Sequence, residues 1–175
     1  MGTQLIKSNI KAGEILGFTR IQNNGTASAD NSIALSSTMA PLVTNQGTEL
    51  SVTFNAPPSG NVEIIAKFYL YTNSTTVAFA LSSTDSGTGF TEVAETQTYD
   101  AGTYRMDETD VNTVSISWVV TGLTAGTATT YYISGDETLG STSTINHGRF
   151  RTTGKHYPPI TIQAISLPNT ITTGE

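Results

Sequence analysis

The chain of 175 residues contains no cysteine and few basic side chains. Without cysteine it can form neither disulfide bonds nor thiolate metal sites, so its stability must come from buried apolar surface or from a partner subunit. Eight residues are lysine or arginine and fourteen are aspartate or glutamate, which gives a formal net charge of −6. Because nucleic-acid binding depends on clustered basic residues, we expect no nucleic-acid partner.

Long apolar runs are missing as well. No stretch of the sequence approaches the length of about eighteen apolar residues that a membrane-spanning helix needs. Residues 1–10 lack the basic start and the apolar centre of a secretory signal. We therefore expect a soluble chain with no membrane partner and no cleaved leader.

What the chain does contain favours strands and turns around a single core, since its length suits one domain. Sixteen glycines and abundant threonine are typical of turns and pleated surfaces. Residues 113–120 alternate polar and apolar side chains with a period of two, and Trp118 falls on the apolar face. Similar runs lie at residues 50–54, 62–71, 76–82 and 160–167. The sequence predicts an all-β fold, an antiparallel β-sandwich with Trp118 in its core.

The longest of these runs, at residues 62–71, has a second face that is only partly polar. Ile65, Tyr69 and Tyr71 lie on that face beside charged residues. A half-apolar outer face is typical of contact with another sheet or subunit. We expect a trimer interface that includes Ile65, Tyr69, Tyr71 and Tyr132, and we expect residues 72–75 to turn the chain into residues 76–82 as a β-hairpin.

Residues 1–40 follow a different pattern. Their apolar side chains show no sustained period of either 2 or 3.6, yet the segment holds three of the eight basic residues, Lys7, Lys11 and Arg20. Such a segment is explained if its apolar groups meet a partner and its basic groups bind acidic groups there. We interpret residues 1–40 as an N-terminal attachment arm and residues 41–175 as the β-sandwich domain.

Few residues suggest reaction chemistry. His147 and His156 lie near neither a serine–acid pair nor a second ligand at helical spacing, so we interpret them as surface or interface residues. Asp107, Glu108 and Asp110 carry ligand types that suit Ca²⁺ but lack the pattern of a calcium loop, which favours solvated loop charge. We predict no catalytic, cofactor or metal site, and no enzymatic activity.

Three blocks of sequence carry a family resemblance. They are Ser51–Ile64 (SVTFNAPPSGNVEI), Trp118–Thr127 (WVVTGLTAGT) running into residues 131–133, and residues 157–160 (YPPI) with residues 164–168 (AISLP). Together they resemble a β-sandwich module of tailed-phage virion proteins, across about two-thirds of the chain. Residues 1–40 are not covered. The resemblance implies a jelly roll of the tumour-necrosis-factor kind, usually trimeric, as found in capsid decoration proteins, head fibres and tail-fibre tips. These motifs carry no catalytic residues.

The resemblance leaves two expectations for function. The first is a homotrimeric structural protein on the virion surface, which docks on the major capsid protein or another virion protein and stabilises the particle. The second is a receptor-binding or glycan-binding module of a tail or head fibre that binds a host surface glycan. The absence of coiled-coil heptads and of a repeated shaft favours the first expectation, since a fibre tip needs a stalk to project it.

Overall fold

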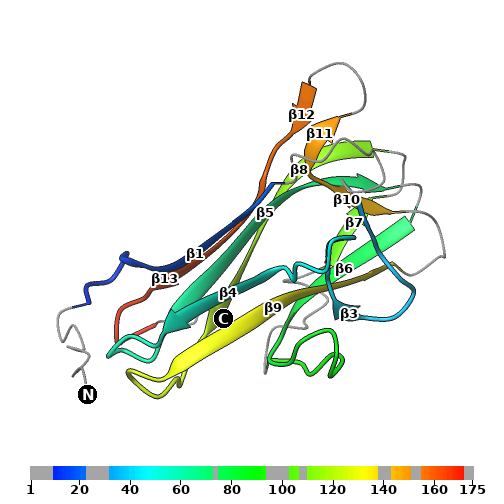
Figure 1. The fold of residues 1–175 in the computed structure, drawn as a ribbon. Coiled ribbons are helices and arrows are strands. Elements are labelled where there is room, and N and C mark those ends of the chain that lie inside the picture. Colours follow the sequence, from blue (N-terminus) through cyan, green and yellow to red (C-terminus); the bar gives the residue numbers. More distant parts are fainter. Residues whose placement is uncertain are drawn as a thin grey trace.

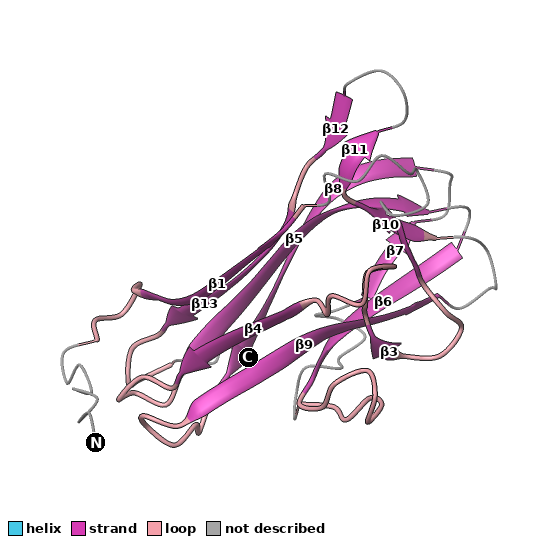
Figure 2. Ribbon diagram, viewed as in Figure 1, coloured by secondary structure: helices cyan, strands magenta, loops and turns pink. Residues whose placement is uncertain are grey.

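The computed structural model describes residues 10–22, 32–72, 75–93, 103–106, 110–137, 143–150 and 155–171. Within these ranges every regular element is a β-strand (Figure 2), as the all-β prediction expected. This part of the chain contains no helix of the length and hydropathy needed to cross a membrane.

Eleven of the strands form two antiparallel sheets (Figure 1). The six-stranded sheet has the order β1-β13-β5-β10-β2, and β8 pairs with β5. Its strands are β1 (Ile15–Ile21), β2 (Ser32–Ala34), β5 (Val62–Thr72), β8 (Asp110–Val120), β10 (Thr144–Asn146) and β13 (Ile160–Ser166). Since β8 pairs with β5 along its whole length and β13 pairs with residues 62–67, β5 is a central strand.

The five-stranded sheet has the order β3-β9-β6-β7, and β4 pairs with β9. Its strands are β3 (Ala40–Pro41), β4 (Ser51–Asn55), β6 (Thr75–Ser82), β7 (Thr103–Met106) and β9 (Ala128–Glu137). Two further strands, β11 (Gly148–Phe150) and β12 (Lys155–Tyr157), pair with each other and project beyond the two sheets (Figure 1).

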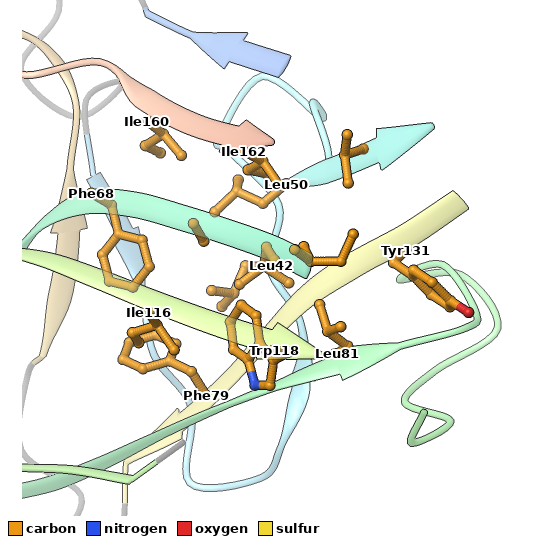
Figure 3. Packing of buried hydrophobic residues seen from close by; sticks show 14 of the residues in the cluster. Leu42, Leu50, Phe68, Phe79, Leu81, Ile116, Trp118, Tyr131, Ile160 and Ile162 are labelled. Carbon is orange, nitrogen blue, oxygen red and sulfur yellow. The ribbon is translucent and has the colours of Figure 1, made fainter. Parts of the chain in front are cut away.

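The two sheets enclose one hydrophobic core, as in a β-sandwich (Figure 3). Alternate residues of β5 and β13 are buried, because side chains of a strand point to opposite faces of its sheet. Trp118 is 3% exposed and belongs to the core cluster, so the prediction of its burial is confirmed. Phe68 of one sheet and Phe79 of the other are among the largest fully buried side chains.

The expected hairpin at residues 72–75 is wrong. β5 ends at Thr72 in the six-stranded sheet, and β6 begins at Thr75 in the five-stranded sheet, where it pairs with β7 and β9. Both strands bury one face in the same core, so their alternation is satisfied equally well when the chain crosses from one sheet to the other.

The N-terminal segment also differs from the expected separate arm. Residues 15–21 form β1, which pairs with β13, and residues 32–34 form β2, which pairs with β10. The register of β1 shifts between Ile15 and Gly17. This irregularity interrupts the alternation of apolar residues within β1. Ile21 is buried in the core, so β1 is part of the sandwich.

Candidate functional site: the outer face of the six-stranded sheet

The face of the six-stranded sheet that points away from the core carries several apolar side chains. Residues directly opposite one another in neighbouring strands share a face. Two such rows cross β1, β13, β5 and β8 in turn: Ile15, Ile165, Glu63 and Val119, followed by Phe18, Gln163, Ile65 and Ser117. We call Ile15, Phe18, Ile65, Val119 and Ile165 the apolar patch.

Three members of the apolar patch are strongly exposed. Ile15 is 56% exposed, Phe18 is 52% exposed and Val119 is 48% exposed. Across the described ranges these are the large hydrophobic side chains with high exposure, and all three lie on this one face. A contiguous exposed apolar surface of this kind is typical of a site that binds another molecule.

A polar row follows the apolar patch along the strands. It contains Arg20, Thr161, Lys67 and Ser115, again in the order β1, β13, β5 and β8. The side chains of Arg20 and Lys67 are exposed, so two positive charges lie at one border of the apolar patch. Arg20 also donates a hydrogen bond from its guanidinium to Oε1 of Gln22.

The three basic residues expected to bind a partner are not brought together. Lys11 precedes β1 near the end of β13, where its carbonyl oxygen accepts a hydrogen bond from the hydroxyl of Ser166. Residues 11–14 form a turn and Arg20 lies close to the other end of β1, so the strand separates the two by about 15–20 Å at the usual rise per residue. Lys7 lies outside the described residues.

The four residues expected at a trimer interface divide between the two sheets. Ile65, Tyr69 and Tyr71 are half-buried on the outer face of β5, as the alternation predicted. The ring of Tyr69 packs against that of Tyr157 at the end of β12, with centroids 5.0 Å apart. Tyr132 instead lies on β9 in the five-stranded sheet, where burial and the nearby carboxylates of Glu49 and Asp85 raise the pKa of its hydroxyl.

The structure revises one of the residues considered for chemistry. The interpretation of His147 as a surface residue is wrong, because this side chain is 1% exposed. It follows Ile145 by two residues and points into the sandwich in the same way. The side chains of His156 and Asp110 lie outside the described part of the structure, as do Asp107 and Glu108 altogether. Among the described side chains, no group of three or more His, Cys, Asp or Glu residues is placed to hold a metal ion.

Comparison with known proteins adds no relative to this geometry. No model of a known protein family matches the chain, and no curated protein shows significant sequence similarity to it.

Proposed function

We propose that this chain is a structural virion protein of a tailed phage, a trimeric jelly-roll module that docks on the particle surface and stabilises it. The observation that carries the proposal is the apolar patch on the outer face of the six-stranded sheet. A second copy of the chain is its occupant, and the major capsid protein is the partner on which the trimer docks.

The strand order supports the jelly-roll part of the proposal. Without the short strands β2, β3 and β10, the sheets read β1-β13-β5-β8 and β4-β9-β6-β7. A jelly roll has eight strands in two such sheets. The chain also crosses between the sheets from β4 to β5, β5 to β6, β7 to β8, β8 to β9 and β9 to β13. Repeated crossing of this kind is the connectivity of a jelly roll, in which one long hairpin is wound into two sheets.

The extent of the outer face supports association between copies. With strands of seven and eleven residues, β1, β13, β5 and β8 cover a footprint of about 600 Å² at the usual strand spacing and rise. Each partner in a stable interface of standard size contributes about 800 Å² of accessible surface. The footprint of this face is of the same order, so the face is large enough for a specific contact.

The arrangement of the two sheets decides which residues belong to the proposed contact. Copies in a cyclic trimer meet through two different surfaces, set so that the ring closes after three copies. The outer faces of the two sheets point away from each other, and copies joined through both would stack into a filament. We therefore place Ile65, which belongs to the apolar patch, in the trimer contact and leave Tyr132 outside it.

Two substitutions on β8 test the trimer. Val119 lies opposite Glu63 and Ser115 lies opposite Lys67, so Val119→Lys and Ser115→Glu each place a charge beside an opposite charge within the subunit. Only Val119→Lys buries a charge at the apolar patch. Light scattering should find a trimer for the unsubstituted chain and for Ser115→Glu, and a folded monomer for Val119→Lys. A monomeric unsubstituted chain at micromolar concentration, or a trimer for all three proteins, would contradict this interface.

The location on the particle needs a separate measurement. Electron microscopy of particles with this protein labelled should show it at symmetric positions on the surface. Particles without the protein should release their contents at lower temperature, because each bound trimer stabilises the lattice to which it binds. Failure to find the protein on purified particles would exclude the virion role while leaving the trimer measurement unaffected.

A further inference from the structure

A cavity of about 200 Å³ lies at the edge of the sandwich, next to the border of the apolar patch at which Arg20 lies. Its walls come from the end of β1, from the turn between β3 and β4, and from His147 between β10 and β11. The volume is smaller than the roughly 300–1,000 Å³ of pockets for drug-sized ligands. A single small molecule, or one unit of a larger one, is therefore the size of occupant that fits.

His147 is the residue that suggests an occupant. Its side chain is 1% exposed, and neither Nδ1 nor Nε2 has a hydrogen-bond partner among the described residues. A buried polar group without a partner destabilises the fold, so its presence here needs a compensating role. Burial lowers the pKa of His147, which keeps the ring neutral, with one nitrogen donating and the other accepting. A hydroxyl group of a ligand satisfies either nitrogen.

The remaining polar walls are cationic or neutral. Arg20 and Gln22 contribute from β1 and the residue after it, while Thr44, Gln46 and Thr48 contribute from the turn. None of the described residues that line the cavity is a carboxylate, although the whole chain carries a net charge of −6. The guanidinium of Arg20 balances one negative charge, and its planar arrangement of N–H groups can donate to both oxygens of a carboxylate.

The turn that covers the cavity is held in place by its own hydrogen bonds. The N–H of Thr44 donates to the carbonyl oxygen of Thr48 at 2.8 Å, and the N–H of Thr48 donates to Oγ1 of Thr44 at 3.0 Å. The N–H of Gly47 donates to the carbonyl oxygen of Thr44 at 2.8 Å. These bonds fix the backbone of the turn, and the side chains of Gln46 and Thr48 line the cavity from it.

We propose that this cavity binds a carboxylated sugar, with Arg20 on the carboxylate and with His147 and the glutamine and threonine side chains on the hydroxyl groups. Amide, hydroxyl and neutral imidazole groups each pair with sugar hydroxyls, which both donate and accept. Among the described lining residues only His147 is of a type that commonly ligates metals, so this set does not favour a metal ion. The sugar is either a free acid or the terminal unit of a glycan, and both present the same group to the cavity.

Calorimetric titration of the full chain with D-glucuronate tests the proposal, with D-glucose as the matched ligand that lacks the carboxylate. D-glucuronate should bind saturably and at least tenfold more tightly than D-glucose, since a hydrogen bond to a charged group contributes about 1.5–3 kcal/mol. A disaccharide that ends in glucuronate is then compared with free D-glucuronate. Tighter binding of the disaccharide assigns the site to the end of a glycan, and equal or weaker binding assigns it to the free acid. Equal binding of D-glucose, tighter binding of inorganic phosphate, or no saturable binding of D-glucuronate would overturn the proposal.

Variants connect the binding to this cavity. Arg20→Gln and His147→Gln should each weaken D-glucuronate binding at least tenfold, whereas Lys67→Gln, which removes the other basic side chain of the same row, should leave it unchanged. If His147→Gln does not fold, Thr48→Val provides the second test, because Thr48 is exposed on the turn. Undiminished binding in both Arg20→Gln and Thr48→Val would place the sugar elsewhere and contradict the assignment.

Discussion

The rings of Phe68 and Phe79 meet across the core, with centroids 4.9 Å apart and planes inclined at 54°. Phe68 belongs to β5 of the six-stranded sheet and Phe79 to β6 of the five-stranded sheet, so this pair joins the two layers. Tilted aromatic pairs of this kind contribute about 0.5–1.5 kcal/mol beyond the area that they bury.

Replacement of Phe79 with alanine should therefore lower the free energy of unfolding by about 3–5 kcal/mol, the usual cost of removing a buried phenylalanine side chain. Urea unfolding followed by the fluorescence of Trp118, the single tryptophan, measures this change directly. Ser117→Ala, on the exposed outer face of β8, is the control and should shift the free energy by less than about 0.5 kcal/mol. A Phe79→Ala protein as stable as the control would show that the two sheets do not pack as described.

Gly17 allows β1 to approach β4 closely. A Cβ atom at this position would lie 2.5 Å from the carbonyl oxygen of Thr53, a distance that requires the backbone to move. Gly17→Ala should destabilise the protein by about 1–3 kcal/mol, the range for overpacking a close contact. Gly87→Ala is the matched control, because the nearest atom to its added Cβ is 3.6 Å away. Equal thermal melting temperatures for the two variants would contradict the close approach of β1 and β4.

The regular strands are the part of the fold that the sequence predicts well. In β5, β8 and β13 one face is buried and the other is not, so period-two alternation marks both the strand and its inward residues, Trp118 among them. The pairing of strands is not encoded in that alternation. A strand that buries one face in the core is satisfied in either sheet, which is why β5 and β6 were expected to form a hairpin.

The candidate sites were predictable in part, for related reasons. The outward positions of Ile65, Tyr69 and Tyr71 follow from alternation within one strand. The apolar patch also needs Ile15 and Phe18 of β1 and Val119 of β8, which the pairing of β1, β13, β5 and β8 brings onto one face. The burial of His147 can be predicted from the sequence, because it follows Ile145 by two residues. The cavity beside His147 cannot be predicted in this way, because Arg20 and Thr48 reach it from elements whose packing no local pattern specifies.

The stability of the protein should fall as the pH drops through the range in which free histidine gains a proton. Burial lowers the pKa of His147 from its ordinary value of 6.5, so the unfolded chain binds a proton there that the native protein does not. The stabilisation is therefore present above pH 6.5 and is lost as the pH falls below it, by at most about 1.4 kcal/mol per pH unit.

Urea unfolding of the unsubstituted chain and of His147→Gln across this pH range measures the effect. The unfolding free energy of the unsubstituted chain, relative to that of His147→Gln, should fall as the pH drops below 6.5. Burial raises the pKa of Asp136, and this acts in the opposite direction at lower pH, but both proteins share it and it cancels in the difference. Parallel pH profiles for the two proteins would show that His147 does not titrate differently in the native and unfolded states.

Removal of residues 2–9 should separate attachment from folding. This deletion takes away Lys7 but stops short of Gly13 and Glu14, whose N–H groups donate to the backbone and side-chain oxygens of Ser166 at 2.7 and 3.1 Å. The edge of the sheet keeps its hydrogen bonds, so we expect a folded trimer that incorporates into particles poorly.

A longer deletion of residues 2–22 should instead destabilise the protein strongly, because it removes β1 and the buried side chain of Ile21. Light scattering, urea unfolding and the occupancy of the protein on purified particles distinguish the two effects. If the shorter deletion incorporates at full occupancy, attachment lies in the sandwich, and Lys11→Glu and Arg20→Glu then show which end of β1 faces the particle.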